Sequence, residues 1–359
     1  MTFQFKKILF AIVSIGGLYL LASCSADSKI VKAPTTEAFP IPTAIDCMVV
    51  DLKEAIIPAR FHRVEEAVTA GGYFDFIDDL VPHLDSTTKY TIDEYVLMRA
   101  NPWLIQKLAD TDYYVTAARD TFVEDPKAVQ ILAQGDSLLV PSADQVRELR
   151  DRMEMTVIDV NIPEFKMRIK EGAAVIHEMD VRVGKNTQRY LAMAGRDVDL
   201  RTHPGIGEIT RIARDPAYIN PRNNKRYKVT KRDDGKVTKL PRIPWLEPTV
   251  NGQRFGQLIH PTTNIGTLGK AYSNGCVGTS EADAWIIYFH APLGTKVQFR
   301  YDLDVINEAG DTLQLKDIYP GFKATKKKYP VYASFYSSFF EKLFSEEEVP
   351  FEACPCDIQ

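Results

Sequence analysis

Apolar positions recur with a helical period in the first half of the chain. Thr91–Ala100 and Asn101–Ala109 both carry apolar residues at the spacing of an amphipathic helix. Asn101 followed by Pro102 predicts a helix start, with Asn101 as the cap and Pro102 in the first turn. Residues 47–150 are therefore predicted to form a mostly helical N-terminal region.

The pattern changes near residue 155, where apolar runs become short, partly alternating and rich in β-branched residues. Pro163 and Gly172 punctuate these runs as turn residues do. The predicted strands are Thr156–Val160, Phe165–Ile169, Ala174–His177, Val181–Val183, Glu208–Ile212, Phe255–Ile259 and Lys296–Arg300. Residues 151–303 are therefore predicted to form a mainly β domain, followed by a C-terminal extension over 304–359.

One apolar helix is predicted inside this β domain. Ser280 and Asp283 have the spacing of a capping box, and Trp285–Phe289 is apolar on all sides. Such a helix is expected to be buried against the sheet. Cys276 would then lie on the turn before the helix, close to an N-terminus whose amides favour negative charge.

A long connection over residues 215–250 differs from its surroundings because it is basic and aromatic. Lys231–Gly235 is typical of a hairpin turn, and several prolines stiffen the return, among them Pro241 and Pro248. A connection of this length predicts a binding loop or lid, with a solvated hairpin as the alternative.

The first residues predict export. Lys6 and Lys7 precede the apolar run Ile8–Leu21, which is too short to cross a bilayer comfortably and is typical of a signal peptide. The following Leu21–Cys24 resembles the bacterial lipobox, in which the cysteine is acylated and becomes the mature N-terminus. This resemblance implies a lipoprotein signal peptide over residues 1–23.

Acylation of Cys24 would anchor the protein to a membrane through lipid and not through a span. The expected location is the cell envelope, facing the periplasm, on the outer membrane. Residues 24–46 contain several prolines and are predicted to form an extended tether. An ordinary signal peptide with a chance cysteine is the alternative.

Composition and charge narrow the function classes. A hydrophobic content of 45% and a charged content of 26% are typical of a globular protein. The net charge of −4 gives no reason to expect nucleic-acid binding, and the oligomeric state stays open. Among the five cysteines, Cys47 is predicted to pair with Cys354 or Cys356 in an oxidising compartment, with three reduced thiols as the alternative.

The candidate chemistry lies between His260 and Cys276, which are 276 − 260 = 16 positions apart. A thiol, an imidazole and bare backbone amides are the groups that cysteine acyl transfer requires. Small residues precede the thiol at Ser273, Asn274 and Gly275, which leaves room for a substrate. His260 follows an apolar run that would deliver its ring to a defined place.

Together these residues resemble the catalytic domain of bacterial L,D-transpeptidases, whose signature is a histidine followed by a Ser-x-Gly-Cys-Val/Ile-Arg box. The resemblance covers roughly residues 155–302. It includes Val157–Phe165, Val181–Lys185, Thr202–Gly205, Ser273–Cys276 and Leu293–Val297. It implies a mainly β fold, a β-sandwich with one buried helix, and no metal or organic cofactor.

By this resemblance, Cys276 attacks the carbonyl between the third residue and the terminal D-alanine of a peptidoglycan stem peptide. The resulting thioester is resolved by an amine of a second stem, which cross-links the cell wall. His260 would act first as general base and then as acid. Amides around Gly275 and Cys276 would hold the oxyanion, and Ser273 and Asn274 would lie in the substrate-binding turn.

The chain departs from the family signature at two positions. Asn274 stands where the box often has histidine, and Gly278 stands where the family usually has arginine. The missing cation puts the preference for the donor or acceptor substrate in question, and Arg254 is a candidate replacement for the cation.

Two other functions are compatible with these residues. Water in place of the acceptor amine would give an L,D-carboxypeptidase or a cross-link hydrolase at the same site. Loss of catalysis would leave a lipid-anchored wall-binding protein, an alternative supported by Gly278 and by the helical N-terminal region. In that region Leu132–Pro141 resembles the last strand of a glycan-binding LysM module, although a plain linker strand fits equally well. Further on, Ala333–Phe344 is predicted to be an amphipathic helix.

Overall fold

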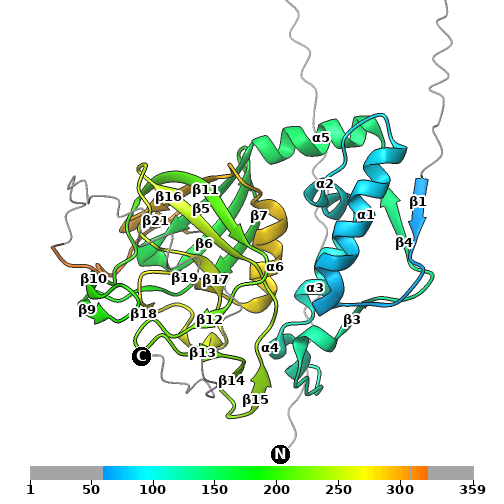
Figure 1. Ribbon diagram of the computed structural model, residues 1–359. Coiled ribbons are helices and arrows are strands. Elements are labelled where there is room, and N and C mark those ends of the chain that lie inside the picture. The colour runs from blue at the N-terminus through cyan, green and yellow to red at the C-terminus, as the bar shows by residue number, and fades with distance from the viewer. Residues whose placement is uncertain (1–59, 308, 322–359) are drawn as a thin grey trace, which may run out of the picture. The chain divides into compact units, whose positions relative to one another are not determined.

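The computed structural model describes residues 60–307 and 309–321, in which a helical region precedes a mainly β domain (Figure 1). The predicted fold class is therefore confirmed. The helices of the first region are α1 Tyr73–Thr87, α2 Glu94–Ala100, α3 Pro102–Ala109, α4 Tyr113–Ala117 and α5 Ala143–Glu154, with short 3-10 turns at Ala70–Gly72 and Pro126–Ala128. Two small antiparallel ladders accompany them, β1 Arg60–Arg63 with β4 Ser137–Val140 and β2 Val68–Thr69 with β3 Gln130–Leu132.

The β domain is built on one eight-stranded sheet with the order β19-β17-β16-β11-β20-β5-β6-β7. Its strands are β5 Thr156–Asn161, β6 Lys166–Glu171, β7 Ala174–Asp180, β11 Gly205–Ala213, β16 Trp245–Val250, β17 Ile259–Pro261, β19 Val277–Thr279 and β20 Lys296–Arg300. Two pairs, β5 with β20 and β17 with β19, are parallel, and the other neighbours are antiparallel.

Short ladders surround this sheet. They are β8 Val183–Gly184 with β18 Ala271–Ser273, β9 Gln188–Leu191 with β10 Arg196–Asp199, β12 Tyr218–Ile219 with β13 Arg226–Tyr227, β14 Val229–Lys231 with β15 Val237–Lys239, and β21 Asp304–Ile306 with β22 Thr312–Gln314. Turns of 3-10 helix occupy Ile162–Glu164 and Ile265–Thr267. The predicted hairpin at Lys231–Gly235 is confirmed as the connection between β14 and β15.

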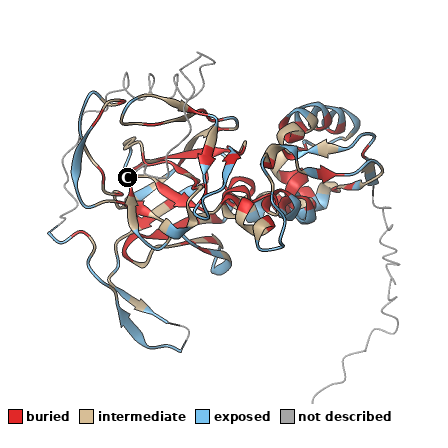
Figure 2. Ribbon diagram, turned by 90° about the horizontal axis from the view of Figure 1, so that it is seen from below, coloured by how far each residue is buried: buried red, intermediate tan, exposed pale blue. Residues whose placement is uncertain are grey.

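Helix α6, Glu281–His290, is capped as predicted and lies between two cores. The Ser280 hydroxyl accepts a hydrogen bond from the Asp283 N–H at 2.9 Å. Ile287 packs with the apolar face of the sheet, as expected. Trp285, Tyr288 and Phe289 instead pack with the helices of the N-terminal region, so the second apolar face of α6 is covered from outside the β domain (Figures 1 and 2).

Two local predictions were wrong. The strand expected over Phe255–Ile259 is limited to β17, Ile259–Pro261, so His260 lies within the strand and not beyond its end. Gly256 has a φ of 69°, which breaks the extended backbone. The side chains on either side of it are turned to His203: the Phe255 ring stacks on the imidazole at 4.4 Å, and the Gln257 amide bonds the His203 backbone.

The second of these predictions concerns the Asn101 side chain. It occupies the cap position of α3 with Pro102 in the first turn, as predicted, but its side chain makes no cap hydrogen bond. Its amide donates to the Leu97 and Leu139 carbonyls and accepts from the Leu139 N–H. The side chain therefore joins two helices to β4, a use that a local pattern does not reveal.

Candidate active site

The thiol and the imidazole predicted from the sequence are brought together at the edge of the main sheet. Strands β17 and β19 pair in parallel, with Ile259 opposite Val277 and His260 opposite Gly278. Cys276 is the residue that enters β19, so it lies beside the strand that carries His260. The prediction that helix α6 follows the cysteine directly was wrong, because β19 separates Cys276 from the helix N-terminus.

The turn that presents Cys276 is closed by its own hydrogen bonds. The Ser273 hydroxyl donates to the Cys276 carbonyl at 2.6 Å and accepts from the Gly275 N–H at 3.2 Å. Gly275 has a φ of 109°, a backbone conformation that residues with side chains rarely adopt. Since the Gly275 amide is used by Ser273, the Cys276 N–H is the amide of this pair that has no partner among the described residues.

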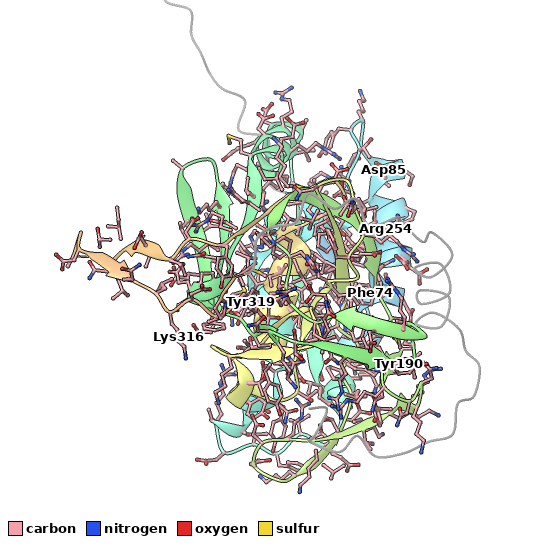
Figure 3. All side chains as sticks on the ribbon, turned by 90° about the vertical axis from the view of Figure 1, so that its left-hand side faces the viewer. Phe74, Asp85, Tyr190, Arg254, Lys316 and Tyr319 are labelled. Carbon is pink, nitrogen blue, oxygen red and sulfur yellow. The ribbon has the colours of Figure 1, made fainter. Side chains whose placement is uncertain are left out.

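A second set of hydrogen bonds holds the same turn from behind. The Thr202 hydroxyl donates to the Gly275 carbonyl at 3.0 Å and accepts from the Gly184 N–H at 2.9 Å. Tyr319 accepts from the Thr202 N–H at 3.2 Å and donates to the Gly184 carbonyl at 2.6 Å (Figure 3). The predicted C-terminal extension thus contributes a fully buried side chain to the support of the candidate nucleophile.

His260 is held in one tautomer. Its Nδ1 lies 2.8 Å from the Pro261 carbonyl, which can only accept, so Nδ1 carries the proton and Nε2 keeps its lone pair. The Trp245 ring lies against the imidazole at 4.9 Å. Burial, reinforced by the charge of Arg182, lowers the pKa of His260 to about 4, so the ring is neutral near pH 7.

Cys276 is partly buried among apolar side chains, including Trp245 and Leu258. Its Sγ donates to the Gly256 carbonyl at 3.7 Å, and no hydrogen bond joins it to His260 within the described ranges. Burial raises the pKa of the Cys276 thiol, while the Leu258 N–H and the charge of Arg182 oppose this rise. The resting pair is therefore a neutral thiol beside a neutral imidazole.

Arg182 was not among the residues predicted to form the site. Its backbone forms a bridge with Gly278, with hydrogen bonds of 2.9 and 3.0 Å in the two directions. Its side chain crosses the Gly278 Cα, because a Cβ built there would meet Arg182 Nε at 2.5 Å. The departure of Gly278 from the family signature was the signal for a displaced cation, but the sequence did not reveal which strand would carry it.

Arg254, the predicted replacement cation, interacts electrostatically with Glu247 and Arg211 (Figure 3). Glu247 is only 1% exposed, and its carboxylate oxygens have no hydrogen-bond partner. Burial raises the pKa of Glu247 to about 7, although Arg254 and Arg211 both lower it. The charges felt by Cys276 are those of Arg182 and Glu247.

The basic connection over residues 215–250 is joined to the body of the protein at several points, one of which is a buried ion pair. Arg232, in the β14–β15 hairpin, donates to Glu281 at 2.5 Å, and both side chains are fully buried. The same connection borders a cavity of about 800 Å³. Tyr218 contributes to its wall and also packs against Trp245, while cationic side chains come from Lys127, Arg226, Lys228, Lys239 and Arg242.

Comparison with known proteins gives a family match for the β domain. The family model of the YkuD L,D-transpeptidase catalytic domain matches residues 155–299. The match includes both His260 and Cys276, and ends before Tyr319. No curated protein matches the chain.

Solved structures similar to this chain include several L,D-transpeptidases. One, residues 123–326 of the enzyme from Xylanimonas cellulosilytica, is 14% identical with a TM-score of 0.30; the match covers 66% of this chain and 97% of that one. An L,D-transpeptidase from Mycobacterium tuberculosis is 14% identical with a TM-score of 0.26, covering 41% and 57% of the two chains. The catalytic domain of the E. faecium enzyme is 17% identical with a TM-score of 0.25, covering 41% and 97%.

Several predictions fall on residues outside the described ranges. They are the signal peptide, the acylation of Cys24, the tether, the pairing of Cys47 with Cys354 or Cys356, and the amphipathic helix over 333–344. Within the ranges that the structure does describe, every helix is too short or too polar to cross a membrane.

Proposed function

We propose that this protein is a peptidoglycan L,D-transpeptidase that forms a thioester at Cys276. The observation that carries the proposal is the pairing of β17, which carries His260, with β19, which Cys276 immediately precedes, inside a region that matches the transpeptidase family. The tautomer of His260 supports it, because the unprotonated Nε2 is the nitrogen able to accept a proton from the thiol.

In the first half-reaction, His260 Nε2 takes the thiol proton and the sulfur attacks the carbonyl between the third residue and D-alanine of a stem peptide. The carbonyl electrons move to oxygen, where the free Cys276 N–H is the donor best placed to receive them. When the carbonyl re-forms, the C–N bond breaks. His260 returns its proton to the departing amine, and an acyl thioester remains on Cys276.

In the second half-reaction, an amine of another stem peptide attacks the thioester. His260 removes the proton that this amine loses, and the sulfur leaves and recovers a proton. The two stems are then joined through their third residues. The hydrogen-bonded turn around Gly275 and Ser273 supports this order of reaction steps, because it holds the nucleophile in one position for both half-reactions.

We further propose that the connection over residues 215–250 contacts the stem peptides. The cavity beside Tyr218 supports this, since its wall adjoins the Trp245 ring that lies on His260. Cationic side chains around it suit acidic peptides. Acylation of Cys24, a location in the cell envelope and a wall-binding role for the N-terminal region remain part of this proposal.

The test uses the full-length chain with a purified stem tetrapeptide and an amine acceptor, followed by mass spectrometry. We expect D-alanine release, a cross-linked product and a thioester on the Cys276 peptide. Cys276→Ala and His260→Gln should abolish all three. His290→Gln is the matched control, because His290 is another partly buried histidine whose Nδ1 bonds a backbone carbonyl, and this variant should keep full activity.

The products also separate the alternatives. Tripeptide without cross-links would establish a hydrolase in place of a transpeptidase. A Cys276 that forms no thioester while the chain still binds peptidoglycan would overturn the enzymatic proposal and leave a wall-binding protein.

A further inference from the structure

We propose that Arg182 supplies the positive charge of this active site, stabilising negative charge at Cys276, and that Gly278 is glycine because the Arg182 side chain occupies the space above it. This inference rests on the proposed function of Cys276 and names a further residue of the same site. It is carried by the pairing of Gly278 with His260 on one side and with Arg182 on the other, at the edge of the sheet.

The first step concerns which side chains share a face. Gly278 is paired with His260 on one side and bridged to Arg182 on the other, so the three residues lie in a row across the strands. Residues paired in this way project to the same face of a sheet. The residues next to them in sequence point the opposite way and are buried in the sheet core: Val181, Val183, Ile259 and Val277.

The second step concerns the space between these side chains. With no side chain at Gly278, the Arg182 side chain lies across the gap between its own strand and β17. A Cβ at position 278 would meet Arg182 Cγ at 2.8 Å and Cδ at 3.1 Å as well as Nε, so any larger residue has to displace the arginine. The backbone at Gly278 is not left-handed, so its conformation does not require glycine. The reason for glycine is the lack of space for a side chain.

The third step concerns the charge itself. The guanidinium Nε is buried without a partner, and one terminal nitrogen bonds the neutral hydroxyl of Thr267 at 3.3 Å. Arg182 forms no ion pair with any described carboxylate. Asp233 and Tyr272 interact with it only electrostatically, as does Cys276. A partly buried positive charge without a counter-ion is costly, and a thiolate or oxyanion at Cys276 would neutralise it.

The charged groups around Cys276 act in opposite directions. Arg182 lowers the pKa of the thiol and Glu247 raises it. Arg182 also lowers the pKa of His260, so it opposes an imidazolium in the resting protein while it favours negative charge on the sulfur or on a substrate oxygen. The arrangement therefore suits a charge that appears only during the reaction.

The test measures the charge at the thiol without requiring turnover. The rate of Cys276 alkylation by anionic iodoacetate is divided by the rate with neutral iodoacetamide, in the full-length chain, by mass spectrometry at fixed pH. A nearby cation raises this ratio. Arg182→Met should lower it about three- to tenfold, and Arg182→Lys should keep part of it.

Two further variants test the placement. Gly278→Ala keeps the charge but displaces the guanidinium, so it should lower the ratio in the same direction as Arg182→Met. The double variant Arg182→Ala, Gly278→Arg returns a cation to the vacated space and should restore the ratio. Arg168→Met is the matched control. Arg168 lies on β6 and is paired with Glu164 and Glu178, so its removal should not change the ratio.

The outcomes separate this inference from the function it rests on. If Cys276 reacts with iodoacetamide but Arg182→Met and Gly278→Ala both leave the ratio unchanged, the inference is overturned while the nucleophile stands. If Cys276 reacts with neither reagent in the folded protein, the proposed function fails first.

Discussion

Two arginines of this protein, the fully buried Arg232 and the partly buried Arg182, are treated in opposite ways. Arg232, in the β14–β15 hairpin, donates to Glu281 and to the Thr238 hydroxyl and lies over the Tyr113 ring. Arg182, beside Gly278, donates to the neutral Thr267 hydroxyl, and its buried Nε has no partner among the described residues. The first charge is neutralised and joins three segments of the chain. The second is left available next to the candidate nucleophile.

This difference separates a structural charge from a functional one. A paired buried charge fixes the position of the elements that carry the two partners, and its removal leaves the other partner uncompensated. An unpaired one contributes nothing to stability in the resting protein, so its presence needs another reason. Burial lowers the pKa of Arg182 to about 10, in keeping with a charge that lacks a counter-ion.

The largest expected effect on stability comes from breaking the ion pair between Arg232 and Glu281. Glu281→Gln leaves the Arg232 guanidinium buried without its carboxylate and should lower the free energy of unfolding by about 3–5 kcal/mol. Chemical denaturation at pH 7 measures this loss. Replacing both partners, Arg232→Met with Glu281→Leu, should recover most of it, and failure to recover would show that the pair does more than neutralise itself.

The next effect concerns Glu247, a buried anion whose carboxylate has no hydrogen-bond partner. Burial raises the pKa of Glu247 to about 7, so folding is favoured while this carboxyl is protonated. Its contribution is complete below about pH 4.5 and is lost as the pH rises through 7. Glu247→Gln should therefore be more stable than the wild type by up to about 3 kcal/mol at pH 8, with the difference vanishing toward pH 4.5.

Parallel denaturation curves at the two pH values provide the measurement. An equal difference between Glu247→Gln and the wild type at both values would mean that Glu247 does not titrate in this range.

A smaller effect comes from a neutral group in the same site. Tyr319→Phe removes a hydroxyl that both accepts from the Thr202 N–H and donates to the Gly184 carbonyl. The expected loss is about 1–3 kcal/mol of stability, together with slower acylation of Cys276, because the Gly275 turn loses support through Thr202. Tyr90→Phe is the control, since the Tyr90 hydroxyl donates to the Pro141 carbonyl at 2.7 Å in the N-terminal region and not in that turn. Equal acylation rates in both variants would contradict the positioning role.

The smallest effect on stability is expected at the unpaired arginine. Arg182→Met should leave the free energy of unfolding unchanged or raise it by about 1 kcal/mol, because a buried charge without a partner is removed. Thermal unfolding measures this directly. A loss as large as that of Glu281→Gln would place Arg182 with the structural charges and remove the contrast between the two arginines.

The parts of the site that sequence could predict are local ones. Ser280 and Asp283 form the expected cap because both partners lie within one helical turn. Cys276 and His260 were recognised from the small residues that precede the thiol and from the family signature that both residues match. Gly275 and Ser273 follow from the same short turn, although the use of the Gly275 amide by Ser273 depends on atomic positions.

The parts that sequence could not predict depend on strand pairing. Arg182 reaches the site through a bridge to Gly278, and Tyr319 reaches it through Thr202. The absence of arginine at position 278 indicated that a cation was missing. Arg254 was chosen as its replacement because it is close to His260 in sequence, a criterion that carries no information on which strands are neighbours.

Helix α6 also determines the order in which this protein can finish folding. Trp285, Tyr288 and Phe289 complete the core of the N-terminal helices, yet they are synthesised long after α1–α3. A nascent chain therefore carries an uncovered apolar face on those helices until residues 281–290 become available. A chain that stops short of α6 is therefore expected to leave that apolar face of the N-terminal helices exposed to water.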